Sequence, residues 1–181
     1  MRNSSAGTVL ILVDMINEFV SGKYGSPRAE KMVPHVLTLL NKARQAEIPV
    51  IYVRDAHREN DPELKVWGKH AMEGTTASEI VTTLKPEKDE TVFSKRQYSA
   101  FLNTGIDRKL KRIGARSIIF AGISADICVQ HNVADAFYRG YTTLAVRECV
   151  ASISADAKER ALKYMETIYG TKILSLKQVE L

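Results

Sequence analysis

The sequence has few cysteines and no long apolar segment, and each absence excludes a class of protein. Its 181 residues include only two cysteines, Cys128 and Cys149, too few for a small secreted domain held together by disulfides. No apolar run approaches the roughly 20 residues that a membrane-spanning helix needs, and residues 1–7 lack the apolar core of a secretory signal. We therefore expect a cytoplasmic protein that does not bind a membrane, with both cysteines as free thiols.

Nucleotide and nucleic-acid binding also lack their usual signatures. No Gly-x-Gly-x-x-Gly motif follows an apolar run, and the sequence contains no Gly-Lys-Ser/Thr phosphate-binding loop. The formal net charge is +5, from 26 lysines and arginines against 21 aspartates and glutamates, but the basic residues are interleaved with acidic ones. This distribution favours a solvated surface over a nucleic-acid interface, and we expect no organic cofactor.

Short apolar runs and amphipathic helical patterns alternate along the chain. Hydrophobic residues make up 45% of the sequence, enough for the core of a single α/β domain over residues 1–181. Leu102 and Phe137 are expected on the buried faces of two of the helices. The predicted strands cover residues 8–13, 48–53, 90–93, 117–121, 142–146 and 171–175, and the predicted helices cover 29–46, 77–84, 103–113, 130–137 and 156–169. This alternation predicts a three-layer α/β/α fold of Rossmann-like topology with a mostly parallel central sheet of about six strands.

Residues 122–129 (GISADICV) join a buried strand to a helix. Ser124 and Asp126 are residue types that commonly cap helix N-termini, which places Cys128 in the first helical turn at the carboxyl end of a strand. The free N–H groups and the dipole of a helix N-terminus favour a thiolate there, so Cys128 is a candidate nucleophile. The alternative is that Cys128 is a small buried apolar residue, the usual role of a free cysteine.

Two more reactive side chains follow predicted strands. Asp14 follows the first strand and Lys95 follows the third, so both are expected at the same sheet edge as Cys128. There Asp14 could take the thiol proton and return it to a leaving group, while Lys95 would stabilise the thiolate. The N–H groups of Cys128 and of a residue just before it are candidates for an oxyanion hole. The alternative for Asp14 is a loop aspartate that accepts hydrogen bonds from nearby backbone N–H groups.

A second cluster consists of Asp55, His57 and His70. Asp55 and His57 follow the second strand, and His70 lies in the long polar segment 58–73, which we expect to be a functional loop. One carboxylate and two imidazoles suit a divalent transition metal, and three protein ligands leave positions open for water or substrate. Taken alone, so short a motif is more often a set of surface hydrogen bonds.

Three segments together resemble one known family. Residues 13–19 (VDMINEF), 93–101 (FSKRQYSAF) and 122–129 are similar to its motifs, and the resemblance runs from about residue 8 to residue 176. The family is that of the isochorismatase-like cysteine hydrolases, which includes nicotinamidase and N-carbamoylsarcosine amidase. The resemblance implies that Asp14, Lys95 and Cys128 are the catalytic triad. It also implies a cis peptide between Ile123 and Ser124, and an oxyanion hole made of the N–H groups of Ser124 and Cys128.

The same resemblance implies a metal and a substrate class. Asp55, His57 and His70 are similar to nicotinamidase ligands for a divalent ion, with zinc as the first choice and manganese or iron also permitted. Phe19, Trp67 and Tyr98 would be apolar walls of the pocket, or ordinary packing residues in the alternative. The chain would cleave a small carboxamide through a thioester and release ammonia, with nicotinamide as the first substrate. A carbamoyl or ureido amidase and a non-catalytic α/β binding protein are the alternatives, and a homodimer or homotetramer is expected.

Overall fold

The computed structural model describes residues 6–181. Residues 1–5 lie outside the described residues; they belong to the predicted domain 1–181 and to the N-terminal segment in which we expected no secretory signal. Within the described residues, six strands form one sheet in the order β3-β2-β1-β4-β5-β6, and all neighbouring strands are parallel. The strands are β1 (Thr8–Val13), β2 (Val50–Asp55), β3 (Thr91–Lys95), β4 (Ser117–Ile123), β5 (Thr142–Ala151) and β6 (Lys172–Leu174). The predicted α/β class and the six-stranded sheet are confirmed.

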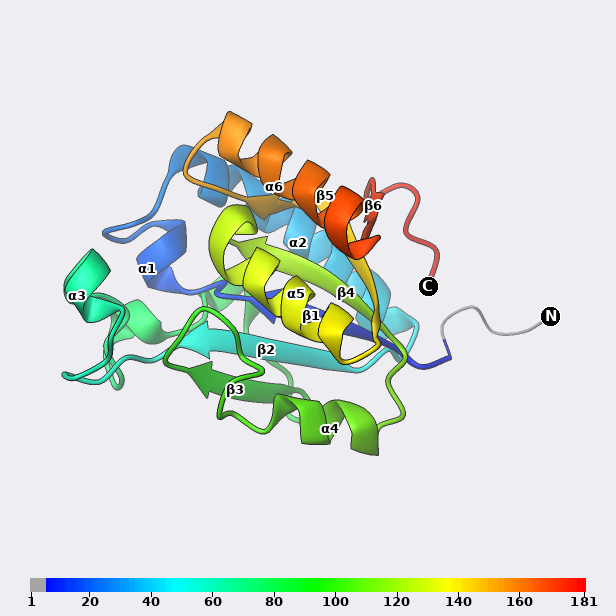
Figure 1. The fold of residues 1–181 in the computed structure, drawn as a ribbon, viewed down its shortest axis with the longest axis horizontal. Helices are drawn as coiled ribbons and strands as arrows, with labels where there is room; N and C mark the ends of the chain where they lie inside the picture. The colour runs from blue at the N-terminus through cyan, green and yellow to red at the C-terminus, as the bar shows by residue number, and fades with distance from the viewer. Residues whose placement is uncertain (1–5) are drawn as a thin grey trace.

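Helices cover both faces of this sheet (Figure 1). Helix α2 (Pro27–Gln45) lies on one face, and α4 (Ile106–Arg112), α5 (Gln130–Tyr138) and α6 (Ala155–Tyr169) lie on the other. Strand β1 is buried on both sides: Leu10 and Leu12 pack toward α2, while Ile11 and Val13 pack toward the three helices opposite. A run without polar residues is what a central parallel strand requires. None of the helices in the described part of the chain is long and apolar enough to cross a membrane.

Short helical elements gather near the carboxyl ends of the strands (Figure 1). They include α1 (Asn17–Val20) and α3 (Leu64–Trp67), the latter within the polar segment that was expected to be a loop. The predicted helix over residues 77–84 is wrong, because the structure has two 3₁₀ turns there, Thr76–Ser78 and Thr82–Leu84. Between them Ile80 forms an antiparallel β-bridge with Ile16, which fixes extended backbone where a helix would have continued.

Two apolar residues that were expected to be buried face solvent. Leu102 is 47% exposed, because α4 begins only at Ile106, after Gly105 has turned the chain with a φ of 85°. Phe137 is 42% exposed in the last turn of α5, where the neighbouring Ala136 is the buried residue. A 3.6-residue pattern predicts which face of a helix is apolar, but it does not predict where the helix begins or how deeply each residue of that face is buried.

The strand order reverses between β1 and β4, and this is where an open α/β sheet leaves a crevice at its carboxyl edge. Gly122 lets the two strands approach there. Its φ is 131°, and a Cβ at this position would lie 1.9 Å from the carbonyl oxygen of Val13. Only glycine fits so close to another backbone. The close pairing of Val13 with Gly122 sets the segment after β4 beside the residue after β1.

Candidate active site

Asp14, Lys95 and Cys128 come together at the carboxyl ends of β1, β3 and β4. The Nζ atom of Lys95 lies 2.8 Å from Oδ2 of Asp14 and donates a hydrogen bond to Sγ of Cys128 at 3.5 Å. It also donates to Oδ1 of Asp55 at 2.5 Å. All four side chains are buried. Although burial lowers the pKa of Lys95, the charges of Asp14 and Asp55 hold it well above its ordinary value, so the ammonium is permanently charged.

Asp14 makes contacts that suit both of the roles that the sequence left open. Its Oδ1 accepts a hydrogen bond from the backbone N–H of Asp55 at 2.8 Å, as a loop-organising aspartate would, while Oδ2 faces Lys95. Burial, reinforced by the charge of Asp55 and opposed by that of Lys95, raises the pKa of Asp14 to about 7. A carboxyl group of this pKa can both accept and donate a proton near neutral pH.

Cys128 lies in a five-residue π-helical turn, Ala125–Val129, that runs directly into α5. Ser124 lies at the predicted N-cap position, but its side chain makes no bond to the helix N–H groups; its hydroxyl donates to Asp126 at 2.5 Å instead. The peptide between Ile123 and Ser124 is cis. Burial raises the pKa of the Cys128 thiol, Lys95 lowers it, and Asp14 raises it again. Burial and the neighbouring carboxylate therefore oppose the preference for thiolate that the helix terminus predicts, and the charge of Lys95 supports it.

A cavity of about 300 Å³ opens in front of the sulfur. Its lining includes Cys128 and Ser124 together with three residues of the second cluster, Asp55, Glu63 and His70. The three residues that were expected as apolar walls, Phe19, Trp67 and Tyr98, all border this cavity. The indole N–H of Trp67 donates to the hydroxyl of Tyr98 at 3.0 Å, so two of these three residues are hydrogen-bonded to each other.

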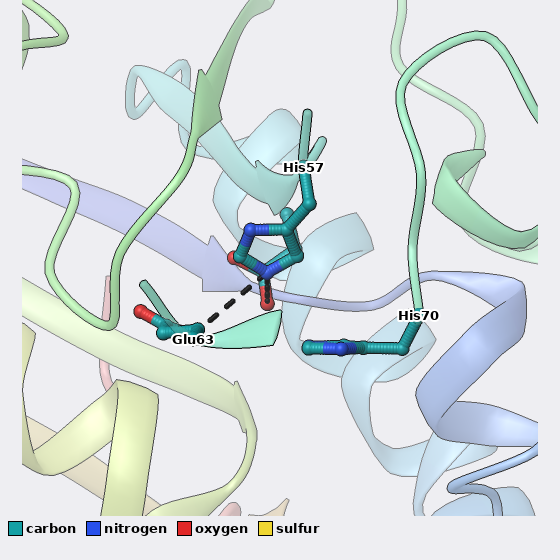
Figure 2. A group of neighbouring side chains, drawn as sticks. His57, Glu63 and His70 are labelled. Carbon is teal, nitrogen blue, oxygen red and sulfur yellow. Dashed lines mark ion pairs between the residues drawn. The ribbon is translucent and has the colours of Figure 1, made fainter. Parts of the chain in front are cut away.

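The second cluster lies beside the first. One potential ligand atom from each of Asp55, His57, Glu63 and His70 lies within 4.8 Å of the others, and all four residues are buried. Figure 2 shows the rings of His57 and His70 as neighbours, with Glu63 on the other side of His57. The ring centroids are 4.6 Å apart. The structure thus brings the three predicted residues together and adds Glu63.

Comparison with known proteins identifies the family. The Isochorismatase domain model matches residues 8–178, nearly the whole chain. The chain belongs to the isochorismatase family. Its relatives include nicotinamidases and amidases that act on amide C–N bonds, and the chain is a hydrolase of this family.

Three solved structures illustrate how similar the hydrolase is to its relatives. The crystal structure of N-carbamoylsarcosine amidase from Thermoplasma acidophilum superposes with a TM-score of 0.90 at 35% identity, covering 96% of this chain and 99% of that one. Nicotinamidase PncA from Bacillus subtilis gives 0.87 at 25% identity, covering 93% and 99%. The pyrazinamidase of Pyrococcus horikoshii in complex with zinc gives 0.85 at 26% identity, with the same coverage. The isochorismatase-like fold is therefore shown over the whole domain.

The hydrolase's own side chains fit a divalent metal ion. Nε2 of His57 and Oε1 of Glu63 are buried without a hydrogen-bond partner, which is costly unless an ion binds there. The Nδ1 atoms of both histidines are already bonded, that of His57 to Asp61 at 3.2 Å and that of His70 to the carbonyl of Gly68 at 2.8 Å. Both Nε2 atoms are therefore left for a metal.

Charge in the cluster supports the same interpretation. Burial and the charge of Asp55 raise the pKa of Glu63 to about 7, because two carboxylates approach each other out of water. A divalent cation would offset both charges and would need two neutral imidazoles to complete its ligand set. Asp55 has one oxygen on Lys95 and the other 3.6 Å from Nε2 of His57, so it joins the two clusters.

Two residues of this hydrolase site were missed in the sequence. Glu63 lies in a loop without periodicity, and no spacing rule connects it with His70. Asn132 left a better signal, since it is a polar residue one helical turn after Cys128 on a buried face. Its side chain donates to the carbonyl of Cys128 at 2.8 Å and accepts from the N–H of Ala100 at 3.0 Å. Asn132 thereby ties the nucleophile turn to the segment that follows Tyr98.

Proposed function

We propose that the chain is a cysteine amidohydrolase that cleaves a small carboxamide through a covalent thioester, with nicotinamide to nicotinate as the first candidate reaction. The observation that carries the proposal is the contact of one ammonium, Lys95, with the carboxylate of Asp14 and the sulfur of Cys128, at the wall of a cavity sized for a small ring. A binding or scaffold protein has no use for this buried charged set, which is costly to bury.

The reaction begins with Asp14 taking the thiol proton while Cys128 Sγ attacks the amide carbon and forms a C–S bond. The N–H groups of Ser124 and Cys128 bind the oxyanion. The tetrahedral intermediate collapses as Asp14 returns the proton to nitrogen, the C–N bond breaks and ammonia leaves. A water molecule then attacks the thioester and gives a proton to Asp14. When the C–S bond breaks, the acid is released and Asp14 reprotonates the sulfur. Lys95 stays charged and stabilises the thiolate in each half.

Asp55, His57, Glu63 and His70 would hold a divalent ion beside the reacting carbon, with zinc as the first choice because a related pyrazinamidase structure contains it. When bound, the ion supplies a ligand position for a ring nitrogen and so orients a pyridine carboxamide. Phe19, Trp67 and Tyr98 would flank the ring. The chain's own contribution is to place the carboxamide between Cys128 and the oxyanion N–H groups.

The alternative is an N-carbamoyl amino-acid or ureido amidase with the same triad. Two observations favour it: the solved N-carbamoylsarcosine amidase superposes with a TM-score of 0.90, and the exposed Lys23 borders the cavity. An ammonium there would attract the carboxylate that carbamoyl amino acids carry and nicotinamide lacks.

We also propose that the protein forms a homodimer or homotetramer. Ile153 borders the cavity and is 72% exposed, and an apolar side chain at a cavity rim is suited to cover by a second copy. Light scattering coupled to size exclusion tests this directly, and a monomer at micromolar concentration would contradict it.

Ammonia release decides between the substrates. We would compare nicotinamide with N-carbamoylsarcosine, using the metal-free protein, the zinc-restored protein and the Cys128→Ala variant. Zinc-dependent release from nicotinamide, absent in the variant, supports the first candidate. Release from N-carbamoylsarcosine that persists without metal supports the alternative. Release of ammonia by Cys128→Ala contradicts both.

A further inference from the structure

An ion pair between the buried Asp61 and the half-exposed Arg96 lies beside His57. Asp61 is only 3% exposed, and its carboxylate accepts hydrogen bonds from three groups. The guanidinium of Arg96 donates from Nε at 2.8 and 3.1 Å to the two oxygens and also from Nη2. Oδ2 accepts in addition from the N–H of Arg58 at 2.9 Å and contacts Nδ1 of His57 at 3.2 Å. Since the carboxylate can only accept, His57 must carry its proton on Nδ1.

This hydrogen bond decides which nitrogen of His57 faces the metal cluster. An imidazole offers a lone pair at one nitrogen only when the other nitrogen carries its proton, and the partner of that proton fixes both the tautomer and the ring orientation. The Nδ1 proton of His70 has a neutral acceptor, the carbonyl of Gly68. His57 uses a carboxylate that Arg96 holds in place, and a carboxylate acceptor makes the opposite nitrogen the more basic ligand.

We propose that Asp61 is a positioning residue of the metal centre, and that Arg96 keeps its carboxylate oriented toward His57. This rests on the proposed metal centre and deepens it. Arg96 directly follows Lys95 at the end of β3. Lys95 binds Asp14 and Asp55, and Arg96 binds Asp61, so two adjacent residues contact both clusters of the site.

The competing interpretation is a purely structural Asp61. Its bond to the N–H of Arg58, three residues earlier, is what a turn-forming aspartate makes. A structural role alone would lower the stability of the metal-free protein and leave the metal affinity of the folded protein unchanged. The two roles are therefore separated by an affinity measurement and not by an activity assay.

The test is the Zn²⁺ dissociation constant of the full chain, measured in competition with a chromogenic chelator. Asp61→Asn keeps the size of the side chain but presents only one acceptor oxygen to three donor groups. We expect zinc binding to weaken by about 10- to 100-fold, the usual effect of losing such an outer partner. Glu59→Gln is the matched control, because Glu59 lies in the same loop but forms an exposed pair with Lys69 and should leave the affinity unchanged.

A second variant, Arg96→Gln, keeps the proposal testable if Asp61→Asn does not fold. The side chain of Arg96 is 48% exposed, so Arg96→Gln should fold, and we expect a smaller loss of zinc affinity, about threefold to tenfold, in the same direction. Wild-type affinity in Asp61→Asn, or in Arg96→Gln if Asp61→Asn does not fold, overturns the proposal. A wild-type protein that binds no zinc overturns it as well. Neither result bears on Cys128-dependent ammonia release, which tests the proposed function independently.

Discussion

Lys95 and Asp55 are joined by a hydrogen bond of 2.5 Å, so one carboxylate belongs to both clusters of the site. Lys95 is the last residue of β3 and Asp55 is the last residue of β2, and the two residues are paired in the sheet. The ammonium of Lys95, which contacts Cys128, is therefore held by Asp55, whose other oxygen faces His57. Asp55 therefore couples the surroundings of the sulfur to the candidate metal-ligand set through its two oxygens.

The coupling predicts that Asp55→Asn impairs two properties at once. Zinc affinity should fall by more than tenfold because an anionic ligand is lost, and kcat should fall by about 100-fold because Lys95 is no longer held between two carboxylates. The matched variant is His70→Asn, which should weaken zinc binding but leave the rate of Cys128 alkylation unchanged. Chelator competition measures the zinc affinity, ammonia release measures kcat, and iodoacetamide labelling measures the reactivity of Cys128. Normal alkylation and turnover in Asp55→Asn would show that the clusters are independent.

The two cysteines should differ in reactivity. Cys128 borders the cavity beside Lys95, whereas Cys149 is fully buried within β5 and is not among the residues that line this cavity. We expect iodoacetamide at neutral pH to label Cys128 at least tenfold faster. Peptide mass spectrometry reads both sites in one sample. Equal, slow labelling would mean that Cys128 is only a packing residue.

The rate of hydrolysis should follow the ionisation of Asp14. Because burial and the charge of Asp55 raise the pKa of Asp14 to about 7, the carboxyl is protonated in mild acid and cannot accept the thiol proton. We expect kcat/KM to rise about tenfold per pH unit below 7 and to level off above it. Initial rates of ammonia release between pH 5 and 9 test this. A profile that is flat across that range would remove Asp14 from the role of base.

Gly122 should be required for the fold at the site. A Cβ there would meet the carbonyl of Val13 at 1.9 Å, with φ at 131°, so Gly122→Ala should lower the free energy of unfolding by about 3 kcal/mol or more. Gly140 is the control, because it also has a positive φ but has open space around an added Cβ. Gly140→Ala should cost only about 1–2 kcal/mol. Urea denaturation compares the two, and equal losses would contradict the steric argument.

The sequence predicted the sheet edge well for a physical reason. Uninterrupted apolar runs identify parallel strands, and the polar residue after each run must emerge at the same edge. That logic placed Asp14, Lys95 and Cys128 together. It failed for Glu63, because the path of an aperiodic loop depends on tertiary contacts. It also missed the effects that oppose a thiolate at Cys128, since the helix terminus is a local effect while the burial and the neighbouring carboxylates are not.

Helical patterns were less informative than strand patterns. Leu102 fits the apolar spacing of its helix but lies before Gly105, where the helix begins. Ile80 lies in a stretch whose spacing suited a helix, yet its backbone pairs with Ile16. In both cases a contact distant in sequence, or a turn-forming glycine, overrode the local preference.

The most direct test of the central claim is to detect the acyl group on Cys128. We would mix the zinc-loaded protein with nicotinamide, quench it in acid during turnover and analyse the peptide that contains Cys128 by mass spectrometry. The account predicts a nicotinoyl thioester on this peptide, absent from Cys149 and absent in the Cys128→Ala variant, which should also release no ammonia. Ammonia release by Cys128→Ala, or an acyl group on another residue, would contradict it.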